Sequence, residues 1–405
     1  MLLRDVIARS DAAFGTSGVR GLVEALDDAT VFAYTAAFLA HVKPEDGSRI
    51  WVGHDLRPSS PRIAQAVLAA ISEAGLKSVF AGEVPTPALA HAALSAGEPC
   101  VMVTGSHIPF DRNGIKFYRA DGEMTKSDET PIIESETPFP KHLFNGNELL
   151  EHLSVEPDAG AVSRLWTQRF IAAFPGLLDG WRVGHFQHSA AGRDLLAAIF
   201  EALGATVIPL ARSETFVPVD TEAVSAETTA QAKTWAQKHD FDALISTDGD
   251  GDRPLLADET GSYFRGDALG ILAAKALGVR TIVTPVSSTS AVEASGYFAK
   301  TIRTKIGSPH VIAAMAGEDG VAGFEANGGF LTGSPLEGQS SSLSPLPTRD
   351  AVLPILATIW LARRSNMRLS QLSSLLPERT TASDRLEHVP RDRSLALIAA
   401  LEANL

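Results

Sequence analysis

Short apolar runs alternate with amphipathic stretches of helical length along most of the chain, and this pattern constrains the fold more than any other feature. Residues 49–55 (RIWVGHD) predict a strand, 61–75 a helix and 100–105 (CVMVTG) a further strand. The same alternation returns in a second stretch at 181–247 and in a third at 266–365. Helices that connect apolar strands are typical of βαβ units with mostly parallel sheets, so we expect an α/β fold.

The chain is long enough for several domains, since its 405 residues exceed the roughly 100–200 residues of a typical domain. A segment rich in proline and acidic residues at 126–160 predicts a linker with one short helix. A hairpin-like turn at 257–261 predicts a second boundary between two strands. We therefore expect three α/β domains and an incomplete C-terminal domain, with bounds 1–145, 146–257, 258–366 and 367–405.

Composition excludes several classes of protein. The formal charge is 35 − 48 = −13 and 45% of the residues are hydrophobic, which argues against disorder and against a nucleic-acid binder. Cys100 is the single cysteine, so no internal disulfide forms, and charges in the first residues interrupt any signal-peptide pattern. No apolar run reaches the roughly 18 residues of a membrane span. We expect a cytoplasmic protein that binds neither nucleic acid nor membrane.

A hydroxyl and an imidazole directly follow the predicted strand at 100–105. They belong to Ser106 and His107, and Lys116 lies in the next predicted strand, NGIKFY. Because ligands of open α/β sheets bind at the carboxyl ends of strands, this position suits a nucleophile. By itself, however, the string is more typical of an ordinary turn with a solvated histidine.

The segment TDGDGDR is far more specific. It places Asp248, Asp250 and Asp252 at every second position after an apolar strand, with a glycine in each gap. Three crowded carboxylates repel one another unless a cation neutralises them, and hard oxygen ligands suit Mg²⁺. A calcium EF-hand is excluded, because Arg253 stands where that loop needs glycine and because a strand precedes the segment. A solvated acidic turn is the remaining alternative.

Two glycine-rich strings carry weaker signals. FGTSGVRG near the N-terminus fits a phosphate cradle to which Arg20 adds charge, and GFEANGGF offers Glu325 and Asn327 to sugar hydroxyls. Each string is about as typical of a plain flexible loop.

GHDLRPSS has a structural interpretation. It ends one predicted strand and opens the next predicted helix. Asp55 and Arg57 therefore predict an ion pair and a helix cap, in preference to a catalytic pair.

Taken together, these strings resemble the α-D-phosphohexomutase superfamily in content, order and approximate separation. The resemblance spans about residues 14–365 and is closest to the phosphomannomutase/phosphoglucomutase type. The strings that carry it are FGTSGVRG, GHDLRPSS, TGSHIPFDRNGIKFY, TDGDGDR, TKIGSP and GFEANGGF. It implies three mixed α/β domains around a central cleft, followed by a smaller C-terminal domain of a different fold.

The resemblance also implies roles for individual residues. Ser106 matches the serine that carries the transferable phosphate, and this serine joins three aspartates around one Mg²⁺ ion: Asp248, Asp250 and Asp252. The residues that match groups holding phosphate or assisting proton transfer are Arg20, His107, Lys116 and Arg253. The residues that match the third-domain loop and the sugar-selecting loop are Lys305, Gly307, Glu325 and Asn327.

The sequence departs from the family pattern in three places. The serine loop reads TGSHIP, which differs from many members on both sides of Ser106. Asn327 stands where serine is usual and Gly329 where some members carry histidine, so sugar preference and the general base stay open. No segment after Arg379 matches the family's C-terminal phosphate loop, and 391–405 predicts only the opening helix of that domain.

These features predict an intramolecular phosphotransferase that interconverts hexose 6-phosphate and hexose 1-phosphate, with mannose phosphates as the first expectation. Its intermediate would be a phosphoserine enzyme with a hexose bisphosphate, which also serves as activator. The alternatives are a mutase of glucose or glucosamine phosphate and a catalytically weak phosphosugar-binding protein. We expect a monomer or weak dimer.

Overall fold

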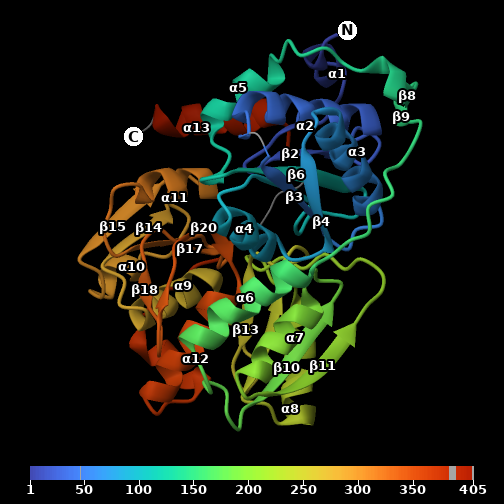
Figure 1. Cartoon of the computed structure of the whole chain (residues 1–405). Coiled ribbons are helices and arrows are strands. Elements are labelled where there is room, and N and C mark those ends of the chain that lie inside the picture. The colour runs from blue at the N-terminus through green and yellow to red at the C-terminus, as the bar shows by residue number, and fades with distance from the viewer. Residues whose placement is uncertain (46, 383–388, 404–405) are drawn as a thin grey trace.

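Three main sheets, of seven, four and five strands, follow one another along the chain (Figure 1). The computed structural model describes residues 1–45, 47–382 and 389–403. Helices pack against each sheet, so the predicted α/β class is confirmed. Each sheet combines parallel and antiparallel pairs.

The first sheet has the strand order β1-β2-β6-β5-β3-β4, with β7 beside β6. Its strands are β1 (Ala13–Phe14), β2 (Val19–Leu22), β3 (Arg49–His54), β4 (Lys77–Glu83), β5 (Cys100–Val103), β6 (Arg112–Arg119) and β7 (Gly122–Glu123). The helices of this part are α1 (Leu3–Ile7), α2 (Asp28–Val42), α3 (Ser60–Glu73), α4 (Thr86–Ser95) and α5 (Lys126–Ile133). Because β5 runs parallel to β3, both point their carboxyl ends to the same edge, and the loop with Ser106 leaves from there.

The second sheet has the order β11-β10-β12-β13. Its strands are β10 (Arg182–His188), β11 (Thr206–Arg212), β12 (Ala243–Thr247) and β13 (Pro254–Ala257), and its helices are α6 (Gly160–Ala173), α7 (Arg193–Ala202) and α8 (Ala226–His239). The stretch TEAVSAETTAQAKTWAQKH predicts a helix over 221–239. α8 begins only at Ala226, because the side chain of Ser225 accepts a hydrogen bond from the amide of Thr228 and so caps the helix there.

The third sheet has the order β15-β14-β16-β17-β20. Its strands are β14 (Thr281–Pro285), β15 (Lys300–Thr304), β16 (Val321–Phe324), β17 (Phe330–Thr332) and β20 (Leu346–Asp350), with the small pair β18 (Leu336–Glu337) and β19 (Ser342–Leu343) beside them. The helical elements are α9 (Gly266–Ala276), α10 (Ala291–Ala294), α11 (Ser308–Met315), α12 (Val352–Arg364) and the 3₁₀ helix η2 (Leu369–Leu375). The last strand of this sheet, β20, runs antiparallel to β17.

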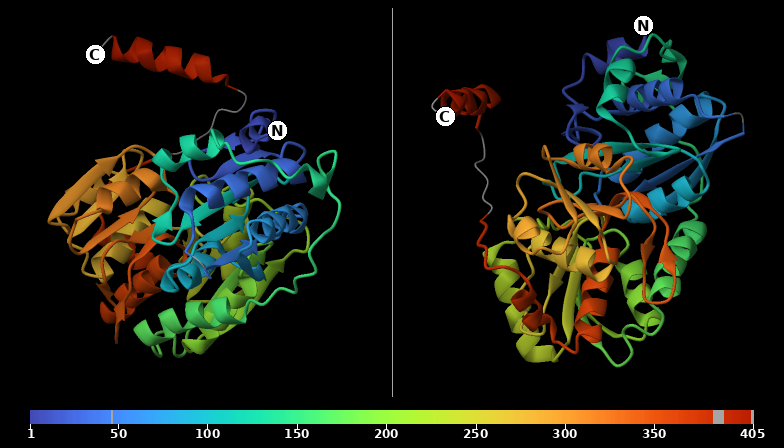
Figure 2. Two further views of the ribbon diagram at one scale, coloured as in Figure 1. Left: turned by 45° about the horizontal axis from the view of Figure 1, so that its top comes forward. Right: turned by 90° about the vertical axis from the view of Figure 1, so that its left-hand side faces the viewer.

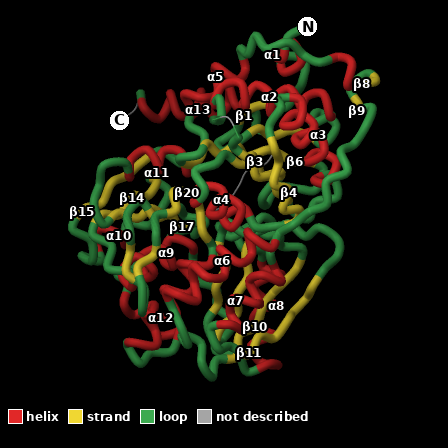
Figure 3. Tube along the Cα trace, in the orientation of Figure 1, coloured by secondary structure: helices red, strands yellow, loops and turns green. Residues whose placement is uncertain are grey.

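The segment 126–160 contains more structure than the predicted linker with one short helix. Beyond α5 it forms a 3₁₀ helix, η1 (Lys141–Leu143), and a hairpin of β8 (Phe144–Asn145) and β9 (Glu148–Leu149). The reason is aromatic packing: the rings of Phe139 and Phe144 stack on each other and contact Phe32 of α2. Only beyond β9 does the chain run as a loop down to the second unit (Figure 3).

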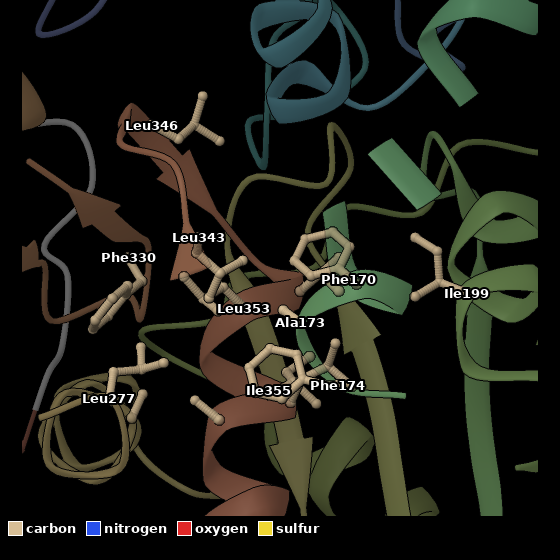
Figure 4. Close-up of a cluster of buried hydrophobic side chains, with 14 of the residues drawn as sticks. Phe170, Ala173, Phe174, Ile199, Leu277, Phe330, Leu343, Leu346, Leu353 and Ile355 are labelled. Atoms are coloured by element: carbon tan, nitrogen blue, oxygen red, sulfur yellow. The ribbon is translucent and has the colours of Figure 1, made fainter. Parts of the chain in front are cut away.

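One hydrophobic core connects the units. Figure 4 shows side chains of this cluster from α6 and the residue that follows it, and from α7, β17 and α12: Phe170, Phe174, Ile199, Phe330, Leu353 and Ile355. Since apolar area is buried between the second and third units, hydrophobic packing fixes their relative position. That fixed position brings loops of different sheets to one place.

The predicted C-terminal helix is present as α13 (Arg391–Glu402) and stands apart from the rest of the ribbon in both views of Figure 2. Its side chains Leu395, Leu397, Ile398 and Leu401 are each more than half exposed. The last residues of the predicted helix, 404 and 405, lie outside the described residues. Within the described ranges, no helix combines the length and apolar character needed to cross a membrane.

A buried histidine on β10 makes stability sensitive to acid. Burial, together with the neighbouring His188, lowers the pKa of His185 from 6.5 to about 3. The unfolded chain binds a proton at His185 at a higher pH than the folded chain does. The neutral imidazole therefore makes its full contribution to the free energy of unfolding above pH 6.5, and this contribution is lost as the pH falls toward 3. We expect the melting temperature of His185→Phe to fall less steeply than that of the wild type between pH 6.5 and about 4. Parallel curves by calorimetry would contradict this assignment.

Candidate active site

The loop after β5 holds Ser106 in a strained and fully buried position. Its φ is +55°, in the left-handed region that non-glycine residues rarely adopt. The backbone amide donates to Thr104 Oγ1 at 2.8 Å, and the side-chain hydroxyl donates to Asp248 Oδ2 at 2.6 Å. His107 Nδ1 lies 3.4 Å from the same hydroxyl. Strain of this kind persists where surrounding contacts over-determine the backbone, which is typical of functional sites.

Arg57 is one source of that constraint. The predicted ion pair is confirmed, since Arg57 Nε lies 3.2 Å from Asp55 Oδ2 with both side chains fully buried. The guanidinium also donates hydrogen bonds of 2.5–3.1 Å to four backbone carbonyls of the serine loop, those of Ser106, Ile108, Pro109 and Arg112. A Cβ atom on Gly105 would lie 2.6 Å from Arg57 Cζ. The loop is thus shaped around this arginine.

The three predicted aspartates converge on the loop between β12 and β13. Asp248, Asp250 and Asp252 are at most 1% exposed, and one carboxylate oxygen of each lies within 4.8 Å of the others. Gly249 permits close approach of the two loops, since a Cβ atom there would lie 2.7 Å from the carbonyl oxygen of Ser106. The acidic loop of the second unit therefore faces the serine loop of the first.

Lys116 partly neutralises this cluster. Its Nζ, which is buried, donates to Asp250 Oδ2 at 2.6 Å and to Asp252 Oδ2 at 2.7 Å. Burial alone would lower the pKa of Lys116, but the two carboxylates outweigh it and raise that pKa. Burial likewise favours the protonated form of Asp250, yet Lys116 holds the pKa of this carboxyl below its usual value. For Asp248, burial and the two neighbouring aspartates raise the pKa well above its usual value.

The cluster also contains oxygens that accept no hydrogen bond from the described residues. Among the described residues, no hydrogen-bond donor reaches Asp250 Oδ1 or Asp252 Oδ1, although both atoms are buried. Buried carboxylate oxygens normally have partners, and an oxygen-only set of ligands suits a hard divalent cation. The residues present therefore fit a metal ion.

Further cationic and imidazole groups surround the cluster. Arg253 Nε lies 3.9 Å from Asp248 Oδ2 and 3.7 Å from Asp252 Oδ1. Burial and the charge of Arg253 lower the pKa of Arg20 to about 10, so this guanidinium remains charged at neutral pH. The same two causes lower the pKa of His107 to about 3, so its imidazole is uncharged.

The third unit contributes the turn between β16 and β17. It carries Glu325 and Asn327, both buried. The carbonyl oxygen of Asn327 accepts a hydrogen bond of 2.8 Å from Thr221 of the second unit. Arg349, on β20, donates to Glu325 Oε2 at 3.2 Å and to Asp252 Oδ2 at 3.0 Å. The expected sugar loop is therefore joined directly to the acidic loop.

The loop with Lys305 and Gly307 lies at the junction of the first and third units. Gly307 has a φ of +120°, and a Cβ atom on it would lie 2.5 Å from Cγ2 of Thr16 in the string FGTSGVRG. The next residue, Ser308, donates to Glu123 Oε2 at 3.1 Å. Lys305 itself is exposed, unlike the other predicted site residues described above.

Three of these contacts were not predicted from the sequence. Arg349 and Thr221 belong to no recognisable motif, and the signal for Arg57 indicated only an ion pair and a helix cap. For Arg349 the available signal is a charged residue within a short strand, and such a residue is usually solvent-exposed. Only the packing of β20 beside β17 shows that it points to the carboxylates.

Comparison with known sequences agrees with the three-sheet division. The models of phosphoglucomutase/phosphomannomutase alpha/beta/alpha domains I, II and III match residues 11–139, 177–261 and 265–379. The chain belongs to the phosphoglucomutase/phosphomannomutase family. The residues of the candidate site come from all three of these family domains.

Curated members of the phosphoglucomutase/phosphomannomutase family resemble the chain over most of its length. A phosphomannomutase of Salmonella muenchen is 46% identical over 402 residues, which cover 97% of this chain and 81% of the relative. A phosphomannomutase of Sinorhizobium fredii is 42% identical over 413 residues, covering 96% and 84%. A phosphoglucosamine mutase of Pelobacter propionicus is more distant, at 29% identity over 90% of this chain and 81% of the relative.

Solved structures of this family show the same fold. A phosphoglucomutase/phosphomannomutase family protein of Burkholderia thailandensis has a TM-score of 0.73 at 20% identity, covering 95% of this chain and 82% of that chain. The Paramecium phosphoglucomutase pp63/parafusin has a TM-score of 0.62 at 18% identity, covering 87% and 70%.

Proposed function

We propose that this protein is a phosphohexomutase that interconverts hexose 6-phosphate and hexose 1-phosphate, and that its substrates are mannose phosphates. The observation that carries this proposal is the hydrogen bond of 2.6 Å from Ser106 to Asp248. It places a strained serine hydroxyl against three clustered carboxylates that fit a cation. The choice of mannose is supported by the two phosphomannomutases at 46% and 42% identity, compared with 29% for the glucosamine mutase.

In this proposal Ser106 carries the phosphoryl group. A sugar hydroxyl attacks the phosphorus, the bond from phosphorus to Oγ breaks, and the hydroxyl proton passes to a base, which gives a hexose bisphosphate. After the intermediate turns, Ser106 Oγ attacks its other phosphorus, the bond from that phosphorus to the sugar oxygen breaks, and the base returns its proton to this oxygen. Mg²⁺ held by Asp248, Asp250 and Asp252 would supply neutralisation of the phosphate charge during these transfers.

The surrounding side chains of the chain have separate tasks in this reaction. Lys116 and Arg253 balance the negative charge next to the phosphoserine, and Arg20 adds a further cation. The imidazole of His107 is uncharged at neutral pH and its Nδ1 lies 3.4 Å from Ser106 Oγ, so it can accept a hydrogen bond from a hydroxyl beside the serine. In the third unit, Glu325 and Asn327 present a carboxylate and an amide, the groups that bind adjacent sugar hydroxyls.

Assays with purified protein test the proposal. The enzyme is incubated with Mg²⁺, a trace of hexose bisphosphate and the 1-phosphate of mannose, glucose or glucosamine, and the 6-phosphate product is measured. We expect the highest kcat/KM with mannose 1-phosphate. Binding of these sugars without any turnover would contradict the mutase assignment, and a higher kcat/KM with glucosamine 1-phosphate would contradict the substrate assignment.

Arg57→Lys is expected to lower kcat for mannose 1-phosphate by about a hundredfold, the loss that a displacement of about 1 Å can cause. A lysine ammonium cannot span the four carbonyls that the guanidinium binds, so the serine loop should relax. Arg62→Lys is a matched control, because Arg62 pairs with Asp28 and binds carbonyls outside the serine loop. Equal kcat for the two variants would show that Arg57 does not hold the loop in its active shape.

A further inference from the structure

Arg349 connects the acidic loop of the second unit with the sugar loop of the third. The side chain is 4% exposed. Its Nε and Nη2 lie 3.0 and 2.8 Å from Asp252 Oδ2, and its Nη1 donates to Glu325 Oε2 at 3.2 Å. One rigid guanidinium therefore contacts Asp252 of the aspartate cluster and Glu325, the only carboxylate of the turn 325–329.

Gly329 makes room for this arginine. A Cβ atom on Gly329 would lie 2.6 Å from Arg349 Cδ and 2.8 Å from Cγ. The φ of Gly329 is not in the left-handed region, so its backbone conformation is open to any residue. Antiparallel pairing of β17 with β20 explains the proximity, because Phe330 is opposite Asp350 and the residues before them, Gly329 and Arg349, are therefore diagonal neighbours across the two strands. The space that Arg349 occupies, and not backbone strain, is the main reason for glycine here, with Asn327 Oδ1 at 3.1 Å as the next contact of such a Cβ atom.

We propose that Arg349 is a positioning residue, which sets the place of the Glu325 carboxylate relative to Asp252 and thereby aligns the sugar hydroxyls with the phosphoryl centre. This role rests on the proposed phosphohexomutase function. The guanidinium is planar and presents several donors in a fixed fork, so it fixes direction as well as charge at both carboxylates.

Charge and geometry make separable contributions at this position. Asp252 and Glu325 are buried, and a cation near them compensates their charge whatever its shape. A lysine at 349 keeps that charge beside Asp252 but has a single ammonium, which cannot form the same fork to Glu325. Arg349→Lys should therefore weaken binding of the sugar more than binding of the metal.

The first experiment compares Arg349→Lys with the wild type and with Arg193→Lys. Arg193 is a matched control, because it is also buried and binds the carbonyls of His188 and Ser213 in the second unit. We measure KM for mannose 1-phosphate, and separately the Kd of MgCl₂ for each protein by calorimetry without sugar.

For Arg349→Lys we expect KM to rise at least about tenfold and the Kd for Mg²⁺ to change less than about threefold, since the charge is kept. Arg193→Lys should leave both values near those of the wild type. An unchanged KM would overturn the proposal, and so would an equal rise of KM and Kd, which would indicate general loosening of the structure.

The second experiment is independent of any enzymatic activity. Gly329→Ala should lower the melting temperature by several degrees in the wild-type background, because the new methyl group clashes with Arg349. In an Arg349→Ser background the same substitution should cost clearly less, because only the contact to Asn327 Oδ1 at 3.1 Å remains. Equal losses in the two backgrounds would overturn the packing argument. If the wild type turned over no hexose phosphate, the proposed function would fail, but this comparison would still decide whether Arg349 and Gly329 are coupled.

Discussion

Ser106→Ala is expected to lower kcat for mannose 1-phosphate by at least about three orders of magnitude, because the transferred phosphoryl group then has no covalent carrier. The fold should persist. The variant loses the hydrogen bond to Asp248, which costs about 1–3 kcal/mol for a buried pair and leaves a domain of this size folded. Turnover measures the loss of activity, and the melting temperature measures whether the fold persists. Mass spectrometry of the peptide that contains residue 106 measures whether phosphate is attached there.

Ser135→Ala is a suitable control for this variant. It removes another buried serine hydroxyl, one that donates to Thr137 in the segment after α5, whose backbone is hydrogen-bonded to the start of α1. We expect it to keep both wild-type turnover and a phosphorylated Ser106 after incubation with hexose bisphosphate. An active Ser106→Ala enzyme, or phosphate found at a different residue, would refute the assignment of Ser106 as the carrier.

Asp250→Asn and Asp252→Asn are each expected to weaken Mg²⁺ binding by more than about a hundredfold, the upper end of the loss caused by removing only a supporting residue. Asparagine keeps the shape of the side chain but removes a charge and one acceptor oxygen. In each aspartate the Oδ1 atom that accepts no hydrogen bond from the described residues is the one available to a cation. Calorimetry with MgCl₂ measures the affinity directly, and turnover should fall with it.

Asp258→Asn controls for the loss of a buried carboxylate on the same segment. Asp258 accepts hydrogen bonds from Thr260 and Ser262 in the turn after β13, outside the acidic cluster. This change should lower stability and leave the Kd for Mg²⁺ unchanged. If Asp250→Asn and Asp252→Asn also bound Mg²⁺ with the Kd of the wild type, the aspartate cluster would not be the metal site.

Most regular elements could be predicted from local pattern. The apolar run at 100–105 became β5 and the amphipathic stretch at 61–75 became α3, since periodicity reports which face of an element is buried. Segment 126–160 was predicted poorly. Its many prolines and acidic residues indicate a linker, whereas Phe139 and Phe144 pack on Phe32 and order the segment. The start of α8 was placed five residues too early, because a capping serine, not the polar pattern, decides where that helix begins.

The candidate site, too, was predicted from the sequence only where the residues are close together along the chain. Regular spacing on one short loop predicted Asp248, Asp250 and Asp252 as a group, since neighbouring residues on one loop are close in any fold. Arg349 had no such local partner: its contacts to Asp252 and Glu325 span 97 and 24 residues. Contacts of this kind follow from sheet order and strand register, and a single sequence does not show them.

By itself the sequence determined the α/β class, the order of its strands and helices, and the chemical groups available for phosphate and metal, because these depend on local periodicity and residue type. The family resemblance implied that Ser106 joins the aspartates, and in the structure Ser106 of the first unit does meet Asp248 of the second. Only the tertiary structure decided that Arg349 joins the acidic loop to Glu325. The physical reason is that a shared hydrophobic core fixes how the sheets lie against one another. That packing sums many weak contacts between distant segments, and it sets the distances on which the chemistry depends.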